Sequence, residues 1–265
     1  MSTLEFRNVT KEYRIRGARG DRKLLAVDDV SFVLEAGRTV ALVGQSGSGK
    51  STIAKLLMQL EKPSSGQILL DGEPVKRHGA GLAEYRRAVQ MVFQDPFASL
   101  NPFHSISHHL ARPLLLHGKA KTPEEVRAGV HRLLERVRLE PVDDVAQRRP
   151  HELSGGQRQR VAIARALAPE PRMLVADEPV SMLDVSIRLG VLNLLAALQR
   201  EENLGVLYIT HDLATARHFS DEILVMFKGR IVERGPSDDV ILHPKHEYTK
   251  LLAEAAPNPE KRVHA

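Results

Sequence analysis

The stretch VALVGQSGSGKST, residues 40–52, joins a short apolar run to a glycine-rich loop and then to the start of a helical pattern. The loop has the spacing G-x-x-x-x-G-K-[ST], which between a strand and a helix is typical of a phosphate-binding loop. Glycine at positions 44, 47 and 49 lets the backbone approach phosphate oxygens where a side chain would collide. The N–H groups of residues 47–52 are then expected to point at the phosphates as donors.

Two side chains of this loop supply charge and a metal ligand. Lys50 brings an ammonium group to the β- and γ-phosphates of a nucleotide, and the Ser51 hydroxyl is a ligand for Mg²⁺. The sequence therefore predicts a site for ATP and Mg²⁺. The residues of the loop predicted to bind the nucleotide are Gly44, Gln45, Ser46, Gly47, Ser48, Gly49, Lys50, Ser51 and Thr52.

Apolar runs rich in Val, Ile and Leu recur along the chain and indicate buried strands. They are RTVALVG (38–44), VQMVF (89–93), RMLVAD (172–177), GVLYIT (205–210) and EILVMF (222–227). Helical patterns at 50–60, 126–139 and 185–202 alternate with them, which predicts an α/β domain with a mostly parallel sheet. The opening segment, 3–35, shows short strand patterns with turn signals and no strong helix.

The chain is expected to form one domain over residues 1–257. Within it, the mostly helical segment at about 95–165 separates two strand-bearing regions and is predicted to be an insertion. The last residues, 258–265, are polar and charged and are predicted to be a disordered tail.

The composition excludes several classes of protein. None of the 265 residues is cysteine, so disulfides and cysteine-ligated metal clusters are ruled out. No apolar run reaches the roughly 18 residues of a membrane-spanning helix, so a role at a membrane would depend on a partner. The net charge of +5 is scattered and aromatic residues make up only 4%, so no nucleic-acid binding is expected.

Two acids end the apolar run RMLVADEP (172–179). Asp177 is expected to lie beside the phosphate-binding loop and to hold Mg²⁺ or one of its waters. Glu178 is expected to point to another side, where it could orient or deprotonate a water that attacks the γ-phosphate. Taken alone, such a pair could also be a solvated turn.

Three further positions carry weaker signals. Gln94 follows the run at 89–93, and His211 follows the run at 205–210. Each could be a surface or structural residue, and Tyr13 could simply be packed in its strand. Ligands of open α/β sheets bind at the carboxyl ends of the strands, however, and this shared location favours a functional role.

A second helix start with a phosphate-binding character lies at HELSGGQRQRVAIARAL, residues 151–167. A Ser-Gly-Gly turn opens this helical pattern, and the first turn of a helix offers free N–H groups and the positive end of the dipole. The order of the motifs, from Tyr13 through GQSGSGKST, Gln94, LSGGQ, VADEP and SMLD to His211, resembles the ATPase domain of ATP-binding cassette (ABC) proteins over about residues 3–255.

This resemblance implies the fold class and a shared site. The fold would be a P-loop NTPase cassette with a mostly parallel sheet core, an N-terminal antiparallel β subdomain and a helical insertion subdomain. Two such domains would pack head to tail with two ATP molecules between them. The residues that would reach the ATP of the other domain are Ser154, Gly155, Gly156, Gln157 and Asp184.

The resemblance also assigns roles to residues of the first site. Tyr13 would stack on adenine, and Gln94 would couple the nucleotide state to a transmembrane subunit. Glu178 would be the catalytic base and His211 the contact to the γ-phosphate. From the residues themselves, Ser51, Gln94 and Asp177 are the predicted metal ligands, and Gln94 could also contact the attacking water and is counted with Glu178 and His211 as catalytic.

The segments that flank these motifs are similar to the oligopeptide/dipeptide importer branch of the family. Within that branch they resemble the second of the two paired ATPase subunits more than the first. Examples are MVFQDPFASLNPF (91–103) and HPKHEYTKLL (243–252). The implied partners are a second ATPase subunit, identical or paralogous, transmembrane permease subunits and, indirectly, a solute-binding protein. The implied location is the cytoplasmic face of the inner membrane. Gln45 and Met182 depart from the branch, which usually has Glu and Ala there, and activity is expected to survive both changes.

Two alternatives to an importer subunit are compatible with parts of the sequence. A soluble, non-transport ABC ATPase acting in translation or on DNA would usually carry two cassettes or a long coiled coil. A P-loop kinase of small molecules would have no use for residues 153–157. The apolar residues that follow Gln94 are expected either to be partly exposed as a docking groove for the permease or to pack inside the insertion. They are Phe93, Phe97, Leu100 and Phe103.

Overall fold

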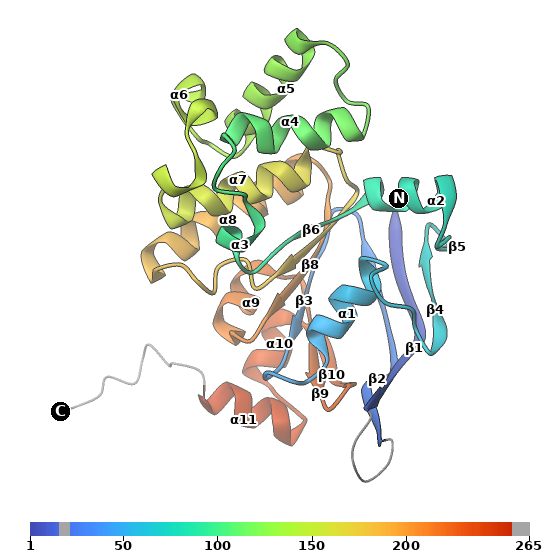
Figure 1. Cartoon of the computed structure of the whole chain (residues 1–265). Coiled ribbons are helices and arrows are strands. Elements are labelled where there is room, and N and C mark those ends of the chain that lie inside the picture. The colour runs from blue at the N-terminus through green and yellow to red at the C-terminus, as the bar shows by residue number, and fades with distance from the viewer. Residues whose placement is uncertain (16–21, 256–265) are drawn as a thin grey trace, which may run out of the picture.

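The computed structural model of the chain describes residues 1–15 and 22–255, which form two β-sheets with helices packed around them (Figure 1). The tail predicted at 258–265 lies outside the described residues. Within the described part of the chain, no helix is long and apolar enough to cross a membrane.

The main sheet has six strands in the order β10-β9-β3-β8-β7-β6. Five of them are parallel and match the five predicted apolar runs, and β10 pairs antiparallel with β9 at the edge. The strands are β3 (Thr39–Val43), β6 (Val89–Val92), β7 (Met173–Asp177), β8 (Gly205–Thr210), β9 (Glu222–Phe227) and β10 (Arg230–Pro236). The predicted parallel sheet is therefore confirmed.

Both faces of this sheet are buried, as a parallel sheet requires. Along β3, Val40 and Leu42 face one apolar cluster, which includes helix α1 (Lys50–Leu57) and the second sheet. Ala41 and Val43 face the other cluster, which includes the helices of the insertion. Because these strands are parallel, the loop after Val43 lies at the same carboxyl edge of the sheet at which β6, β7 and β8 end.

The second sheet is antiparallel, in the order β2-β1-β4-β5, with β1 (Thr3–Ile15), β2 (Arg22–Glu35), β4 (Ser65–Leu70) and β5 (Glu73–Pro74). The expected short strands in the opening segment are wrong, since β1 and β2 run for 13 and 14 residues. The turn-like residues Asn8 and Asp29 lie within the strands. Both have positive φ, of 49° and 51°, beside a shift of register, and the Asn8 amide donates to Asp29 at 2.9 Å. They form a bulge and not a turn.

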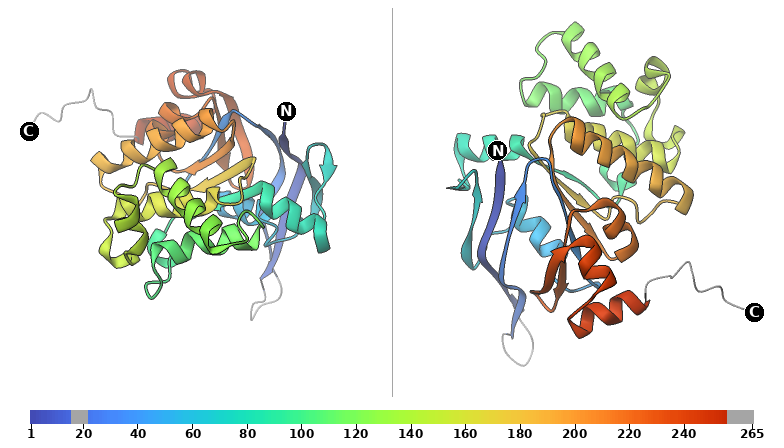
Figure 2. Two further views of the ribbon diagram at one scale, coloured as in Figure 1. Left: turned by 90° about the horizontal axis from the view of Figure 1, so that it is seen from above. Right: turned by 180° about the vertical axis from the view of Figure 1, so that it is seen from behind.

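The helices between β6 and β7 form the insertion, which lies beyond one end of the main sheet, on the side away from the antiparallel sheet (Figure 2). They are α3 (Pro96–Ser99), α4 (Ile106–Leu116), α5 (Pro123–Arg136), α6 (Val142–Gln147), a 3-10 turn (Pro150–Glu152) and α7 (Gly155–Leu167). Helix α5 begins before the predicted 126, because Thr122 and Glu125 form a capping box and Pro123 occupies the first turn.

The remaining helices are α2 (Gly79–Ala88), α8 (Val185–Glu201), α9 (Leu213–Phe219), α10 (Ser237–Leu242) and α11 (Glu247–Ala255). Helix α8 confirms the pattern predicted at 185–202. Helix α1 ends at Leu57, earlier than the predicted 60, because Gln59 takes a positive φ of 54°.

Candidate nucleotide site

A cleft of about 940 Å³ opens at the carboxyl edge of the main sheet. Most of the residues predicted for the chain's own nucleotide line it, and of the phosphate-binding loop only Gly44 and Ser48 do not. Those that do are Tyr13, Gln45, Ser46, Gly47, Gly49, Lys50, Ser51, Thr52, Gln94, Asp177, Glu178 and His211. Sequence reasoning missed five further lining residues, Leu24, Leu25, Ala26, Lys228 and Gly229, which belong to β2 and the β9–β10 turn.

The glycines of the phosphate-binding loop are required by the neighbouring chain as well as by any ligand. A Cβ at Gly44 would lie 2.3 Å from the carbonyl oxygen of Met226. Gly49 has a φ of 112°, and a Cβ there would lie 2.3 Å from the carbonyl oxygen of Ala26. Gly47, with a φ of 80°, has open space around its missing Cβ. Of these three glycines, only Gly47 is left without a contact inside the chain that would exclude a side chain, so the approach of a phosphate is the remaining steric reason for glycine at this position alone.

The expectation that all N–H groups of residues 47–52 point into the site is wrong for two of them. The Ser48 N–H donates to the Gln45 carbonyl at 3.2 Å, and the Thr52 N–H donates to the Gly49 carbonyl at 3.0 Å. Both bonds close turns within the loop and the first turn of α1.

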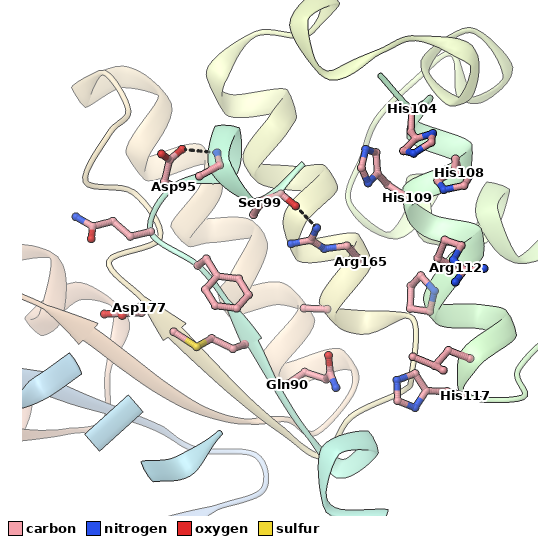
Figure 3. A pocket seen from close by; sticks show the side chains of 17 residues that line it. Gln90, Asp95, Ser99, His104, His108, His109, Arg112, His117, Arg165 and Asp177 are labelled. Atoms are coloured by element: carbon pink, nitrogen blue, oxygen red, sulfur yellow. Dashed lines mark hydrogen bonds between the residues drawn. The ribbon is translucent and has the colours of Figure 1, made fainter. Parts of the chain in front are cut away.

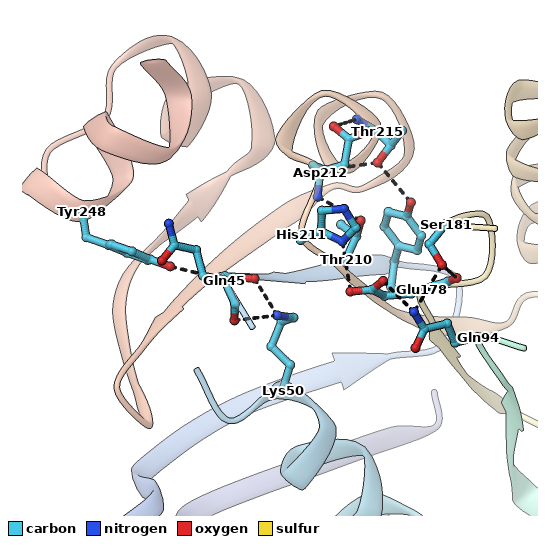
Figure 4. Close-up of polar contacts among 12 residues, drawn as sticks. Gln45, Lys50, Gln94, Glu178, Ser181, Thr210, His211, Asp212, Thr215 and Tyr248 are labelled. Carbon is cyan, nitrogen blue, oxygen red and sulfur yellow. Dashed lines mark hydrogen bonds and ion pairs between the residues drawn. The ribbon is translucent and has the colours of Figure 1, made fainter. Parts of the chain in front are cut away.

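Lys50 is folded back onto its own loop. Its ammonium donates to the carbonyl of Gly44 at 2.5 Å and to that of Gln45 at 3.0 Å (Figure 4). Burial lowers the pKa of Lys50, and the nearby charges of Glu178 and Asp177 oppose that shift. A phosphate would replace two neutral acceptors with charged oxygens, and hydrogen bonds between charged groups are the stronger ones.

The acidic pair at the end of β7 divides between two environments. Asp177 lines the cleft, and burial raises its pKa, with a further rise from Glu178 and an opposing effect of Lys50. Glu178 has a positive φ of 44°, which turns it away from the direction of the strand. The expectation that the two carboxylates face different sides agrees with this backbone.

Glu178 joins two other predicted side chains. Its Oε2 accepts a hydrogen bond from the Gln94 amide at 3.1 Å, and its Oε1 lies 3.0 Å from Nδ1 of His211 (Figure 4). The strands β6, β7 and β8 thus bring three residues that are far apart in sequence to one point. Ser181, which was not predicted, is a fourth member, because it accepts weakly from Gln94 at 3.4 Å and donates to the Glu178 carbonyl at 3.0 Å.

Tyr13 lies at the apolar side of the cleft. The ammonium of Lys11 is 4.9 Å from the centre of its ring and is itself held by Glu61. Leu24 and Leu25 of β2 line the same part of the cleft and are half exposed. An aromatic ring beside exposed leucines is suited to a flat, apolar base.

The second predicted phosphate-facing helix start is built as expected locally. Ser154 caps α7, since its hydroxyl accepts from the Gln157 N–H at 3.2 Å, and the Gln157 side chain accepts from the Ser154 N–H at 2.9 Å. Gly156 leaves room for Ile187 of α8, whose Cγ2 would lie 2.6 Å from an added Cβ. Gly155 faces Leu183 at 3.4 Å in the same way.

The residues assigned to the other domain's ATP gather at a separate place. The turn at 154–157 lies against the start of α8, where Asp184 is the exposed N-cap. None of these five residues is among those that line the cleft around Lys50, as far as the described part of the chain goes. The turn at 154–157 and Asp184 therefore lie together, apart from the cleft around Lys50.

A second cavity, of about 920 Å³, lies between β6 and the insertion (Figure 3). Phe93 lines it with 44% of its surface exposed, and Phe103 beside it is 80% exposed, whereas Leu100 is only 1% exposed. The side chain of Phe97 is outside what the structure describes. Each alternative therefore holds for some of these apolar residues: Phe93 and Phe103 are exposed, and Leu100 is packed inside the insertion.

The fold and the cleft together define a P-loop nucleotide-binding cassette with a helical insertion. The profile of the ABC transporter family matches residues 27–181, and the chain belongs to this family. The expected fold class and resemblance are thereby confirmed, and ATP is the nucleotide that the family implies.

Named relatives agree with this assignment. The Di/tripeptide transport ATP-binding protein DppF of Pseudomonas aeruginosa is 46% identical over 261 residues, covering 97% of this chain and 79% of the relative. The Oligopeptide transport ATP-binding protein OppF of Bacillus subtilis is 47% identical over 237 residues, covering 89% and 77%. A solved structure, the dimeric post-hydrolysis state of the ATP-binding cassette MJ0796 bound to ADP and Pi, has a TM-score of 0.76 at 32% identity, covering 88% and 98%.

Proposed function

We propose that this chain is the ATP-binding and ATP-hydrolysing subunit of a membrane importer for peptides or peptide-like solutes. The observation that carries the proposal is the meeting of Lys50, Asp177 and Glu178 in one cleft, with Gln94 and His211 bound to Glu178. The printed names of the two relatives support the solute class. The alternatives, a non-transport ABC ATPase and a small-molecule kinase, have no observation in their favour.

In this proposal the cleft binds one ATP. Tyr13 and the leucines of β2 receive the adenine, and the loop from Gly44 to Thr52 surrounds the phosphates. Lys50 leaves its two carbonyl acceptors for the β- and γ-phosphates. Burial lowers the pKa of Lys50 and so disfavours its charged form. The negative charge of the bound phosphates would oppose this effect and favour the protonated ammonium.

The residues present fit Mg²⁺ bound together with the nucleotide. Asp177 is a partly buried carboxylate, and Ser51 and Gln94 supply the neutral oxygens that this hard cation prefers. No three His, Asp or Glu side chains gather as a metal site within the described residues, so nucleotide oxygens would complete the coordination. When bound, the ion would neutralise charge that develops on the phosphates.

Hydrolysis would depend on Glu178. Its carboxylate accepts the proton of a water whose oxygen forms a bond to the γ-phosphorus, while the bond from that phosphorus to the bridging oxygen breaks and ADP leaves. Gln94 and His211 hold the carboxylate from both sides, which limits its freedom to turn away. His211 would also contact the γ-phosphate.

The second phosphate-facing region would serve a second ATPase subunit, identical or paralogous. Ser154 and the glycines after it would contact the γ-phosphate held by the other subunit, with Gln157 keeping the turn in shape and Asp184 crossing beside it. Exposed apolar residues flank Asp184 on α8 and its preceding loop. They are Met182, Val185 and Leu189. The dimeric structure of the MJ0796 cassette supports this arrangement, because it is a pair of similar chains.

The cavity of Figure 3 would receive a segment of a transmembrane permease, which would place the chain at the cytoplasmic face of the inner membrane. The supporting observation is the exposure of Phe93, which lines this cavity, and of Phe103, which precedes the lining residue His104. A solute-binding protein would be reached only through the permease. The proposal as a whole is tested by measuring ATP-driven peptide uptake into vesicles that contain the permease and this chain. Uptake that needs neither ATP nor this chain would contradict it.

A photo-crosslinking residue at Phe103 is expected to capture the permease, because this side chain stands free beside the cavity. The same residue at Leu251 of α11, which is also apolar and 63% exposed, is the matched control and should capture little. Mass spectrometry of the crosslinked bands gives the answer. Equal capture from both positions would argue against the cavity as the docking site.

Asp177→Asn is expected to raise the Mg²⁺ concentration needed for half-maximal ATP hydrolysis by about 10-fold, since loss of a metal partner commonly costs that much affinity. Asp143→Asn, which changes an exposed side chain of α6, is the control and should leave the Mg²⁺ curve in place. Titrating Mg²⁺ at fixed ATP measures both. An unshifted curve for Asp177→Asn would remove this residue from the metal site.

A further inference from the structure

A tyrosine from the last helix contacts the phosphate-binding loop from outside the cleft. Tyr248 of α11 is only 7% exposed, and its hydroxyl oxygen accepts a hydrogen bond from the Gln45 N–H at 2.9 Å (Figure 4). Its ring stacks on Phe227 at the end of β9, with ring centres 4.2 Å apart and planes 30° apart. The hydroxyl is thus held by packing on one side and by the loop on the other.

The bond is made to the same peptide group that holds Lys50. The N–H of Gln45 and the carbonyl of Gly44 belong to one planar unit, and that carbonyl accepts from the Lys50 ammonium at 2.5 Å. Tyr248 therefore fixes the orientation of this peptide plane from the side opposite to the lysine. When Lys50 turns to the phosphates, the tyrosine bond remains to hold the plane.

Two other contacts also support the loop. The Gly229 N–H donates to the Ser48 carbonyl at 2.9 Å, and Met226 blocks any side chain at position 44. Both come from β9 and the turn after it, the strand on which Tyr248 is stacked. The part of the loop that begins at Gln45 is the one that Tyr248 holds.

We propose that Tyr248 is a positioning residue for the ATP cradle, acting through the Gly44–Gln45 peptide plane. It is not among the described residues that line the cleft, so its effect on a nucleotide would pass through the loop. The inference rests on the proposed function of the cleft as the ATP site. It assigns a use to α11, a helix that none of the predicted nucleotide-binding motifs includes.

Tyr248→Phe keeps the ring and its stacking on Phe227 and removes only the hydroxyl. We expect the KM for ATP and the Kd of a fluorescent ATP analogue to rise about 3- to 10-fold, the usual worth of one hydrogen bond, with kcat unchanged within about 2-fold. Hydrogen exchange of the Gln45 amide should become faster in the same variant. A tyrosine with a merely structural role would not change that amide selectively.

Tyr85→Phe is the matched control. Its hydroxyl donates to the Leu57 carbonyl at 2.6 Å, at the end of α1 away from the phosphates, and Tyr85 is as buried as Tyr248. We expect this variant to lose thermal stability without a change in KM for ATP. Comparing the two variants separates an effect on the loop from a general loss of stability.

Two results would overturn the inference: an unchanged KM and Gln45 exchange in Tyr248→Phe, or an equal rise of KM in both variants. Lys50→Ala distinguishes this failure from failure of the proposed function. If Lys50→Ala loses affinity for the analogue while Tyr248→Phe binds as the wild type does, only the role of Tyr248 is refuted. A Lys50→Ala variant with wild-type affinity would refute the ATP site itself.

Discussion

Glu178→Gln is expected to lower kcat for ATP hydrolysis by about 10²- to 10⁴-fold, the range that general base catalysis contributes. The amide has the shape of the carboxylate but cannot accept the proton of the attacking water. Its oxygen can still accept from Gln94, and its neighbours at the end of β7 are unchanged. ATP binding should therefore persist, with the nucleotide trapped and not hydrolysed.

The matched control is Glu202→Gln, which removes a carboxylate from an ion pair with Arg136 far from the cleft. Its kcat should equal that of the wild type. Phosphate release under saturating Mg²⁺ and ATP measures both variants, and binding of a fluorescent ATP analogue confirms that the site is intact. Turnover near the wild-type rate in Glu178→Gln would show that another group is the base.

Ser154→Asp is expected to lower kcat/KM by about 100-fold. Aspartate is as good a helix N-cap as serine, so α7 should keep its first turn. The new carboxylate, however, would face the γ-phosphate held by the other subunit, and the hydrogen bond from the serine hydroxyl to a charged oxygen would be lost. The effect should fall on turnover, because the cleft that first binds ATP is elsewhere on the same chain.

Thr122→Asp provides the control for this substitution. Thr122 caps α5 with the same kind of capping box that Ser154 forms on α7, and it lies in the same insertion. Both variants should have similar melting temperatures, and only Ser154→Asp should lose turnover. Equal activity in the two would mean that the serine-glycine turn has no part in the reaction.

The sequence was sufficient to predict the parts of the fold that repeat a simple pattern. Each parallel strand is a short apolar run, and Gln94, Asp177 and His211 stand at or just after the carboxyl ends of three of them, so their shared location could be predicted. The contact between Glu178 and its two partners follows from that topology. The long strands β1 and β2 could not be predicted, because Asn8 and Asp29 are turn-forming residues that here form a bulge by bonding to each other.

Most features of the site that could not be predicted from the sequence depend on contacts between segments that are distant along the chain. Gly44 and Gly49 look like ligand-binding glycines, yet the carbonyls of Met226 and Ala26 already exclude a side chain there. Tyr248 contacts a loop 203 residues earlier, and no local pattern relates the two. Leu100 is buried and Phe103 is exposed, although both are apolar residues of one short segment.

In the proposed mechanism each ATP is held by two polypeptides, since the turn at 154–157 does not line the cleft of its own chain. The most direct test is the molar mass of Glu178→Gln by light scattering, with Mg²⁺ and either ATP or ADP. We predict twice the monomer mass with ATP, the monomer mass with ADP, and the monomer mass with ATP once Ser154→Asp is added. A monomer with ATP bound at full occupancy in Glu178→Gln would show that one chain holds its ATP without a second subunit.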